Sequence, residues 1–212
     1  AKQISVAKDF LKLLKKNHLI SEKIMLNAMD ISAEEGNIED LQENLQYLLK
    51  HNMEITPKIA SVCMKTFINR SEYQSALDFF NDHIDRFKGM KSNELSEIYQ
   101  EGFKVLFNFK KFKVAWDLVN SLEITPGILY VYIKLCYEND QTRDAEKIFK
   151  KAIRKITPYT ETIKHVAENS LNSLTDELIE LIMKHPVKGN LEVLKSITVN
   201  LCHSDLKLEK LF

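Results

Sequence analysis

The sequence predicts an all-α protein, a right-handed α-α superhelix of about five to six helical hairpins with roughly 34 residues each. Three observations support this prediction: turn-forming residues are scarce, apolar residues keep a helical spacing, and one helix-entrance motif recurs. The 212 residues include only 5 Gly and 4 Pro. Sheet proteins need those residues for their many turns. We therefore expect long helices joined by short connections.

A leading helix is expected near the start of the sequence. From Ile4 to Leu14 the apolar residues follow a helical period, and Lys8 and Lys12 fall on the outer side. The polar pair that begins with Asn17 ends this segment. Similar apolar stripes recur along the rest of the chain, and strand-like alternation is absent. We therefore expect about eleven helices of one to two dozen residues each.

Helix entrances supply the clearest repeat. The triplet Ile-Thr-Pro occurs at 55–57, 124–126 and 156–158. Its Thr hydroxyl can accept a backbone N–H as an N-cap, and its Pro suits the first helical position, where no donor is needed. Variants of the entrance begin at Ile20 and Lys91. The predicted caps, at 21, 56, 92, 125 and 157, follow one another in steps of 35, 36, 33 and 32.

A second feature keeps nearly the same period in the other helix of each hairpin. Where two helices cross closely, a small residue is followed four positions later by a large apolar one that fills the groove. The crossing positions are Leu41, Ala76, Ala115 and Ala145. Trp116, beside one of them, is expected in the core. The predicted repeats are 21–55, 56–90, 91–124, 125–156 and 157–188, with a leading helix in 1–20 and a partial repeat in 189–212. No linker interrupts them, so one continuous array over 1–212 is expected.

Composition and motifs argue against several classes of protein. The 30 basic and 30 acidic residues balance, so a globally basic nucleic-acid coat is excluded. The 3 cysteines lie far apart, which suits buried free thiols in a reducing compartment. No membrane span, phosphate-binding loop or zinc motif occurs. We expect neither an enzyme nor a cofactor or metal. Because the sequence starts at Ala1 without Met and ends on apolar residues, we expect part of a longer protein.

Several segments resemble the pentatricopeptide repeat. They are 129–137 with 144–149, the less regular 92–122, and a hairpin turn at 36–41. This resemblance, to the fungal mitochondrial type, implies a mitochondrial protein that binds single-stranded RNA and acts in RNA processing, stability or translation. The tetratricopeptide repeat is the runner-up, because Ala145 and Phe149, followed by Pro158, are similar to its second helix. That resemblance implies a scaffold that binds a protein partner within a larger complex.

The pentatricopeptide resemblance also implies which residues contact RNA. The family reads bases through a residue near the fifth position after a first-helix cap, together with the cap of the next repeat. The candidates carried over, with nearby lysines for the phosphates, are Lys58, Ser61, Gln100, Tyr130, Lys134, Thr162 and Asn190. In the third repeat, counting from the cap gives Glu97 instead of Gln100. In the first repeat, Leu26 holds the position and cannot hydrogen-bond a base, so we expect weak base selectivity.

Structural roles remain alternatives for the same residues. Ser61 suits helix packing, Tyr130 suits the core of a hairpin, and Gln100 and Thr162 suit a solvated surface. The basic run at 143–155 is expected to be a solvated face, with contact to RNA phosphates as the alternative. Besides RNA and a protein partner, a homodimer is a further alternative. It would form through the apolar C-terminal residues Leu208, Leu211 and Phe212.

Overall fold

The computed structural model describes residues 2–87, 90–170 and 174–184, and only the backbone is described at 2–4, 92–94, 175 and 182–184. Within these residues the protein has eleven α-helices, one short 3₁₀-helix and no strand. The prediction of an all-α protein is therefore confirmed. Contacts divide the chain into two compact units, residues 1–108 and 109–212.

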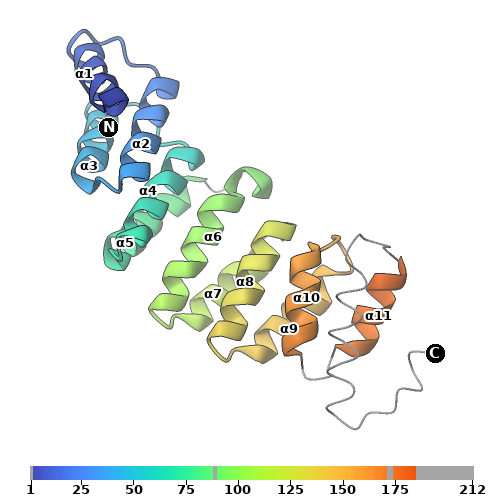
Figure 1. Cartoon of the computed structure of the whole chain (residues 1–212). Helices are drawn as coiled ribbons and strands as arrows, with labels where there is room; N and C mark the ends of the chain where they lie inside the picture. The colour runs from blue at the N-terminus through green and yellow to red at the C-terminus, as the bar shows by residue number, and fades with distance from the viewer. Residues whose placement is uncertain (1, 88–89, 171–173, 185–212) are drawn as a thin grey trace. The chain divides into compact units, whose positions relative to one another are not determined.

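The first unit consists of helical hairpins. Their first helices form a row, and the second helix of each hairpin packs beside this row. Its elements are α1 (Lys2–Lys16), α2 (Glu22–Glu35), α3 (Ile38–Lys50), α4 (Pro57–Asn69), α5 (Tyr73–Ile84), η1 (Asp85–Phe87) and α6 (Ser92–Asn108). Helices α2, α4 and α6 pack side by side in that order (Figure 1). Helix α3 packs against α2, and α5 packs against both α4 and α6. The row α2–α4–α6 therefore carries the predicted first-helix positions of this unit.

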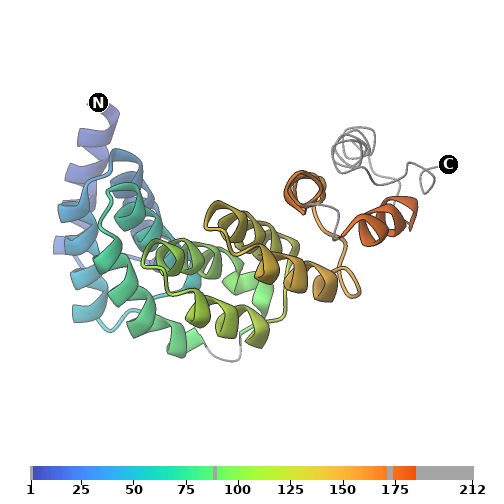
Figure 2. The same cartoon turned by 90° about the horizontal axis from the view of Figure 1, so that it is seen from below.

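The second unit has the same local organisation. Its helices are α7 (Phe112–Ser121), α8 (Pro126–Glu138), α9 (Thr142–Ala152), α10 (Thr160–Asn169) and α11 (Thr175–Lys184). Helix α8 packs against its hairpin partner α9 and also against α10, which in turn contacts α11 (Figures 1 and 2). The neighbouring first helices α8 and α10 thus form one surface of this unit.

Three of the predicted N-caps are confirmed by their hydrogen bonds. The hydroxyls of Ser21, Thr56 and Thr125 accept the backbone N–H three residues later, at 3.4, 3.4 and 3.3 Å. Pro57 and Pro126 occupy the first helical positions of α4 and α8. Helices α4 and α8 begin at these prolines for two reasons: the Thr hydroxyl accepts a backbone N–H that has no partner within the helix, and the Pro has no N–H that needs a partner.

The prediction of a fourth cap at Thr157 is wrong. Helix α10 begins at Thr160, and its N-cap residue Tyr159 makes no side-chain capping bond. Tyr159 is extended, with φ −66° and ψ 151°, so Pro158 cannot be the first residue of the helix. The first helical bond instead joins the Ile163 N–H to the Tyr159 carbonyl at 3.2 Å. At the remaining predicted cap, Ser92 is already part of α6.

Each of the four hairpin turns that the structure describes in full contains one residue in the left-handed conformation. These residues are Gly36, Ser71, Lys110 and Asp140, with φ of 62°, 61°, 54° and 57°. Each lies five positions before a predicted crossing residue. Three of the turns also close with a backbone bond to the residue five positions earlier, as in the bond from Glu72 to Phe67 at 2.8 Å. The turn conformation therefore keeps the same spacing as the crossing residues.

The crossing positions predicted from the sequence lie in the core. Leu41, Ala76, Ala115 and Ala145 are all fully buried. In the first unit, the close approach also involves a glycine on the opposing helix. A Cβ on Gly102 of α6 would lie 2.5 Å from the ring of Phe80 on α5. The hairpin α4–α5 can therefore pack tightly on α6 only because position 102 has no side chain.

The described cysteines are buried, as expected for free thiols. Cys63 and Cys136 are fully enclosed, and burial raises the pKa of each thiol to about 12. Cys202 lies outside the described residues. No described helix has both the length and the hydropathy of a membrane span.

Candidate nucleic-acid interface

Two of the predicted RNA-contacting residues meet in the first unit, around a carboxylate. Lys58 and Ser61 lie on α4, one turn apart, together with Lys65. Glu97 on α6 accepts hydrogen bonds from all three side chains. Its Oε2 lies 3.2 Å from Lys58 Nζ, 3.1 Å from Ser61 Oγ and 3.0 Å from Lys65 Nζ. The residue that the sequence offered as an alternative to Gln100 is therefore the centre of this cluster.

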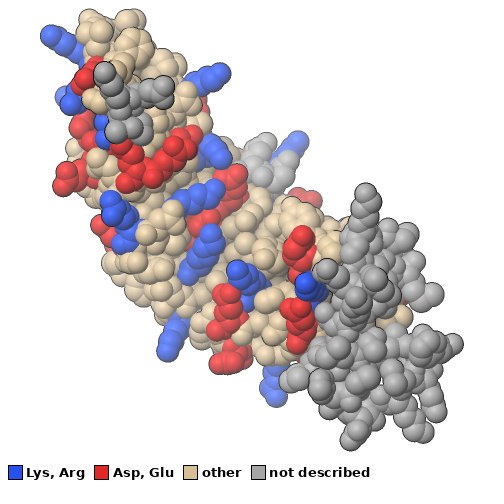
Figure 3. All heavy atoms as spheres, in the orientation of Figure 1, with Lys and Arg blue, Asp and Glu red and all other residues tan. Residues whose placement is uncertain are grey.

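The polar groups of the cluster bond to one another. Hydrogen bonding from Lys65, aided by Lys58, lowers the pKa of Glu97 to about 2 against the opposing effect of burial, so its carboxylate is ionised at neutral pH. Ser61 is fully buried and donates its hydroxyl to that carboxylate. On the face shown in Figure 3, the basic side chains of the first unit lie next to acidic ones. Lys58 and Ser61 are therefore brought together, but their polar groups are already engaged within the protein.

Of the other candidates, Gln100 and Thr162 have surroundings of their own. Gln100 is half-buried and donates a hydrogen bond to Ser96 on its own helix at 2.9 Å. Thr162 on α10 is fully buried, so the expectation of a solvated side chain is wrong. Burial also keeps the hydroxyls of Thr162 and Ser61 from reaching a base in this conformation. Asn190 lies outside the described residues.

Tyr130 and Lys134 remain accessible and lie together on α8. Their spacing of four residues puts them on the same helix face, next to the buried side chains of Leu129 and Ile133. Tyr130 is half-buried, and Lys134 is exposed. The nearest carboxylate to Lys134, on Glu138, is 3.8 Å away, and both side chains are nearly half exposed. Such a pair contributes little to stability, so the ammonium group is available to another anion.

The contact between α8 and α10 contains three polar atoms without a partner. Among the described residues, the hydroxyl oxygens of Tyr137 and Thr162 and Nε2 of His165 are buried without a hydrogen bond. The rings of Tyr137 and His165 meet edge to face, with centroids 5.5 Å apart. Buried polar groups are nearly always hydrogen-bonded. Unused hydrogen-bonding capacity therefore lies beside the face that carries Tyr130 and Lys134.

The expectation that Trp116 lies in the core is wrong. Its side chain on α7 is half-buried, and Lys147 of α9 lies over its ring, with Nζ 5.8 Å from the centroid. Lys151, one turn further along α9, donates a hydrogen bond to Asn120 of α7 at 2.9 Å. The sequence contained a signal for this surface, the dense basic run at 143–155, but its contact with α7 depends on packing.

No cluster of three or more metal-binding side chains occurs in the described part of the chain. No protein-family model matches the sequence, and no curated protein matches it. Function therefore has to be inferred from the residues and their geometry.

Proposed function

We propose that the protein is an RNA-binding helical-repeat protein, a pentatricopeptide-like superhelix that acts in mitochondrial RNA processing, stability or translation. The mitochondrial role rests on the sequence resemblance. The regular placement of left-handed turns before the crossing residues supports a repeat of helical hairpins. The ligand in this proposal is single-stranded RNA, which arrays of this kind contact through their first helices.

The observation that carries the proposal is the accessible face of α8. Tyr130 offers an aromatic surface for a base, and Lys134, one turn away, offers a cation for a phosphate. Stacking on an aromatic side chain contributes about 1–3 kcal/mol per base and tolerates any base. Helix α8 therefore combines a stacking surface with an accessible cation.

Binding of this kind has little base selectivity. The two small polar residues that suit the family's base readout, Ser61 and Thr162, are fully buried. Lys58 is held by Glu97. Stacking and phosphate contacts remain, and neither depends on the identity of the base.

Fluorescence anisotropy with a labelled 15-nucleotide single-stranded RNA at low salt tests this proposal. The full chain should bind, and the double variant Tyr130→Ala/Lys134→Ala should weaken binding by about tenfold, because one stacking contact and one phosphate contact are lost. The control is Tyr159→Ala/Lys58→Ala, which removes an exposed tyrosine outside the α8 face and a lysine already paired with Glu97. Absence of binding by the full chain at any salt concentration would refute RNA binding.

A second function, that of a protein-binding scaffold, is favoured by the exposed surface of α1. The four most exposed large apolar side chains in the described residues are Val6, Phe10, Leu13 and Leu19. The spacing of the first three forms one stripe along α1. The stripe continues into a cavity of about 300 Å³ between α1 and α2, lined by Leu11, Leu14, Ile24 and Ile31. Single exposed apolar residues are common, but a continuous stripe marks an interaction surface.

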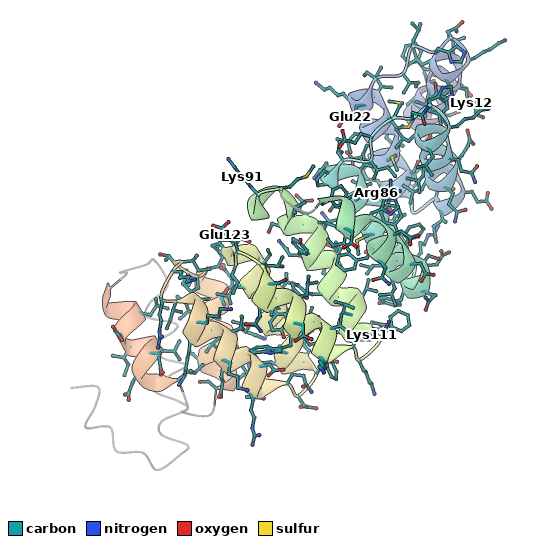
Figure 4. The ribbon with its side chains drawn as sticks, turned by 180° about the vertical axis from the view of Figure 1, so that it is seen from behind. Lys12, Glu22, Arg86, Lys91, Lys111 and Glu123 are labelled. Carbon is teal, nitrogen blue, oxygen red and sulfur yellow. The ribbon has the colours of Figure 1, made fainter. Side chains whose placement is uncertain are left out.

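The charges beside this stripe suit an acidic amphipathic helix of a partner protein. Lys8 and Lys15 are turned toward α3, where they pair with Asp40 at 2.6 Å and Glu43 at 3.0 Å. Lys12, seen on α1 in Figure 4, and Lys16 are exposed and form no ion pair with a described residue. A helix with apolar residues on one face and Glu beside them would cover the stripe and neutralise both lysines.

Two matched peptides test the scaffold function. Both are 15-residue amphipathic helices with Leu at helical spacing; one has Glu beside the Leu positions, and the other has Lys there. The full chain should bind the acidic peptide, Phe10→Ser/Leu13→Ser should abolish binding, and Lys12→Glu/Lys16→Glu should reverse the preference. Equal binding of both peptides, or of the acidic peptide by the Phe10→Ser/Leu13→Ser variant, would contradict this assignment.

A further inference from the structure

The outer face of α9 carries a straight row of cations. Arg143, Lys147 and Lys150 follow one another at spacings of four and three residues, and Arg154 continues the row in the turn after the helix. All lie opposite the buried side of the helix, which is formed by Ala145, Ile148, Phe149 and Ala152. Between 142 and 155 the chain has six basic residues and two acidic ones, Asp144 and Glu146. The positive charge is therefore concentrated on one side of one helix.

The row continues across the contact with α7. Lys147 Nζ lies 5.8 Å from the centre of the Trp116 ring, and Lys151 Nζ donates to Asn120 Oδ1 at 2.9 Å. Lys113, on the same side of α7 as Trp116 by helical spacing, is exposed. We call this set the α7–α9 surface; it consists of Lys113, Trp116, Asn120, Arg143, Lys147 and Lys151.

Most of this charge is not neutralised within the described protein. In the row, Lys150 pairs with Glu177 of α11 at 2.8 Å. Arg143, Lys147 and Lys151 form no ion pair with a described residue, unlike Lys58 and Lys65, which share the carboxylate of Glu97. The second unit therefore presents available cations on α9, the second helix of its hairpin.

We propose that the α7–α9 surface binds the phosphate backbone of single-stranded RNA, with one base stacking on Trp116. The proposal rests on RNA binding as the function, and it adds a contact on the second helix α9 to the contact on the first helix α8. Non-selective single-strand sites combine a positively charged track with aromatic side chains. The Lys147 ammonium already lies over the Trp116 ring. A stacked base would take its place and leave Lys147 to pair with the adjacent phosphate.

The aromatic ring distinguishes this ligand from other anions. An acidic peptide or an anionic membrane would be attracted by the same cations. A nucleotide can use the aromatic ring and the cations together, because its base can stack on the ring while its own phosphate pairs with a neighbouring cation. Asn120, one turn after Trp116 on α7, accepts the hydrogen bond from Lys151 and so holds that cation on the same surface.

Charge reversal on α9 tests this inference with the same 15-nucleotide RNA. The variant Arg143→Glu/Lys147→Glu is compared with Lys12→Glu/Lys16→Glu, which makes the same change in net charge on the unpaired lysines of α1. The α9 variant should lose at least tenfold in affinity, and the slope of log K against log salt should fall by about 1.4, since each lost phosphate contact removes about 0.7. The α1 variant should bind like the unmodified chain.

Substitutions of Trp116 separate stacking from charge. Trp116→Phe keeps a ring and should retain most of the affinity, whereas Trp116→Leu keeps apolar volume and should lose about five- to tenfold. Circular dichroism melts establish that each variant is folded, and Lys147→Gln serves as a milder substitution where another variant fails to fold.

The outcomes distinguish this inference from the proposed function. If the unmodified chain binds RNA and the α9 variant binds equally well, the α7–α9 surface is not the site, and RNA binding itself stands. If both variants lose affinity equally, the effect is one of net charge, and the assignment is overturned. If no RNA binds but vesicles containing phosphatidylserine bind through Arg143 and Lys147, the ligand is a membrane surface and both proposals fail.

Discussion

The buried hydroxyl of Ser61 donates a hydrogen bond to the carboxylate of Glu97, a residue 36 positions later in the chain, at 3.1 Å. The bond joins the adjacent helices α4 and α6. It also fixes the carboxylate between Lys58 and Lys65. Ser61, which was predicted to contact RNA, thus links α4 to α6 by a hydrogen bond.

This arrangement makes stability depend on acidity. The pKa of Glu97 is lowered from 4.5 to about 2 in the folded protein, so the stabilisation is complete above the unfolded value and is lost as the pH falls toward 2. Since the side chain is nearly half exposed, the effect is about 1 kcal/mol. Urea unfolding at pH 6 and pH 2.5 measures it. Glu97→Gln should lose stability at pH 6 and show a smaller difference between the two pH values; an unchanged pH dependence would show that Glu97 is not the responsible group.

Gly102 should be intolerant of even one methyl group. In Gly102→Ala the new Cβ would lie 2.5 Å from the Phe80 ring. The ring or the helix must move, and we expect a loss of about 1–3 kcal/mol in the free energy of unfolding. Chemical denaturation measures the loss. The double variant with Phe80→Leu should be less destabilised than the two single changes combined; strict additivity would show that the two positions do not contact.

Introducing a glycine at one turn residue and removing a glycine at another should have opposite effects on stability. Lys110 adopts a φ of 54°, which is strained for a residue with a Cβ, so Lys110→Gly should stabilise by up to about 1 kcal/mol. Gly36 adopts a φ of 62° and lies against the Arg70 side chain, so Gly36→Ala should destabilise by about 1–2 kcal/mol. Thermal melts of both variants check the pair. A destabilised Lys110→Gly variant would contradict the backbone conformation assigned to this turn.

The three Ile-Thr-Pro triplets should not be equivalent in mutagenesis. Thr56→Ala and Thr125→Ala each remove a capping hydrogen bond and should cost about 1 kcal/mol. Thr157→Ala should have a smaller effect, because α10 begins at Thr160 and Thr157 does not cap it. Comparison of the three urea midpoints decides the matter. Equal losses at all three sites would mean that Thr157 caps a helix in solution.

Much of the helical organisation could be predicted from local sequence. Apolar spacing gave the helices, and capping chemistry placed the starts of α2, α4 and α8, because the groups involved lie within three residues of each other. Thr157 belongs to the same triplet as Thr56 and Thr125, so no local signal separates it from them. Thr157 does not cap α10 because Tyr159 is extended and the helix begins only after it.

The candidate site was less predictable because its partners come from distant parts of the sequence. Helical spacing put Lys58 and Ser61 on one face, but the carboxylate that engages them comes from the next hairpin. Trp116 follows a crossing residue and was therefore expected in the core. It is half-buried, and α9 brings Lys147 over its ring. In both cases the sequence of a helix predicted which residues share a face. The contacts of those residues depended on the neighbouring helix and could not be predicted.

The buried thiols provide a chemical reporter in each unit. Cys63 lies in the first unit and Cys136 in the second, and a thiol with a pKa of about 12 has almost no thiolate at neutral pH. An alkylating reagent therefore reacts with either sulfur only after the surrounding helices separate. Peptide mapping of the modified positions over time would measure how often each unit opens, without any engineered label.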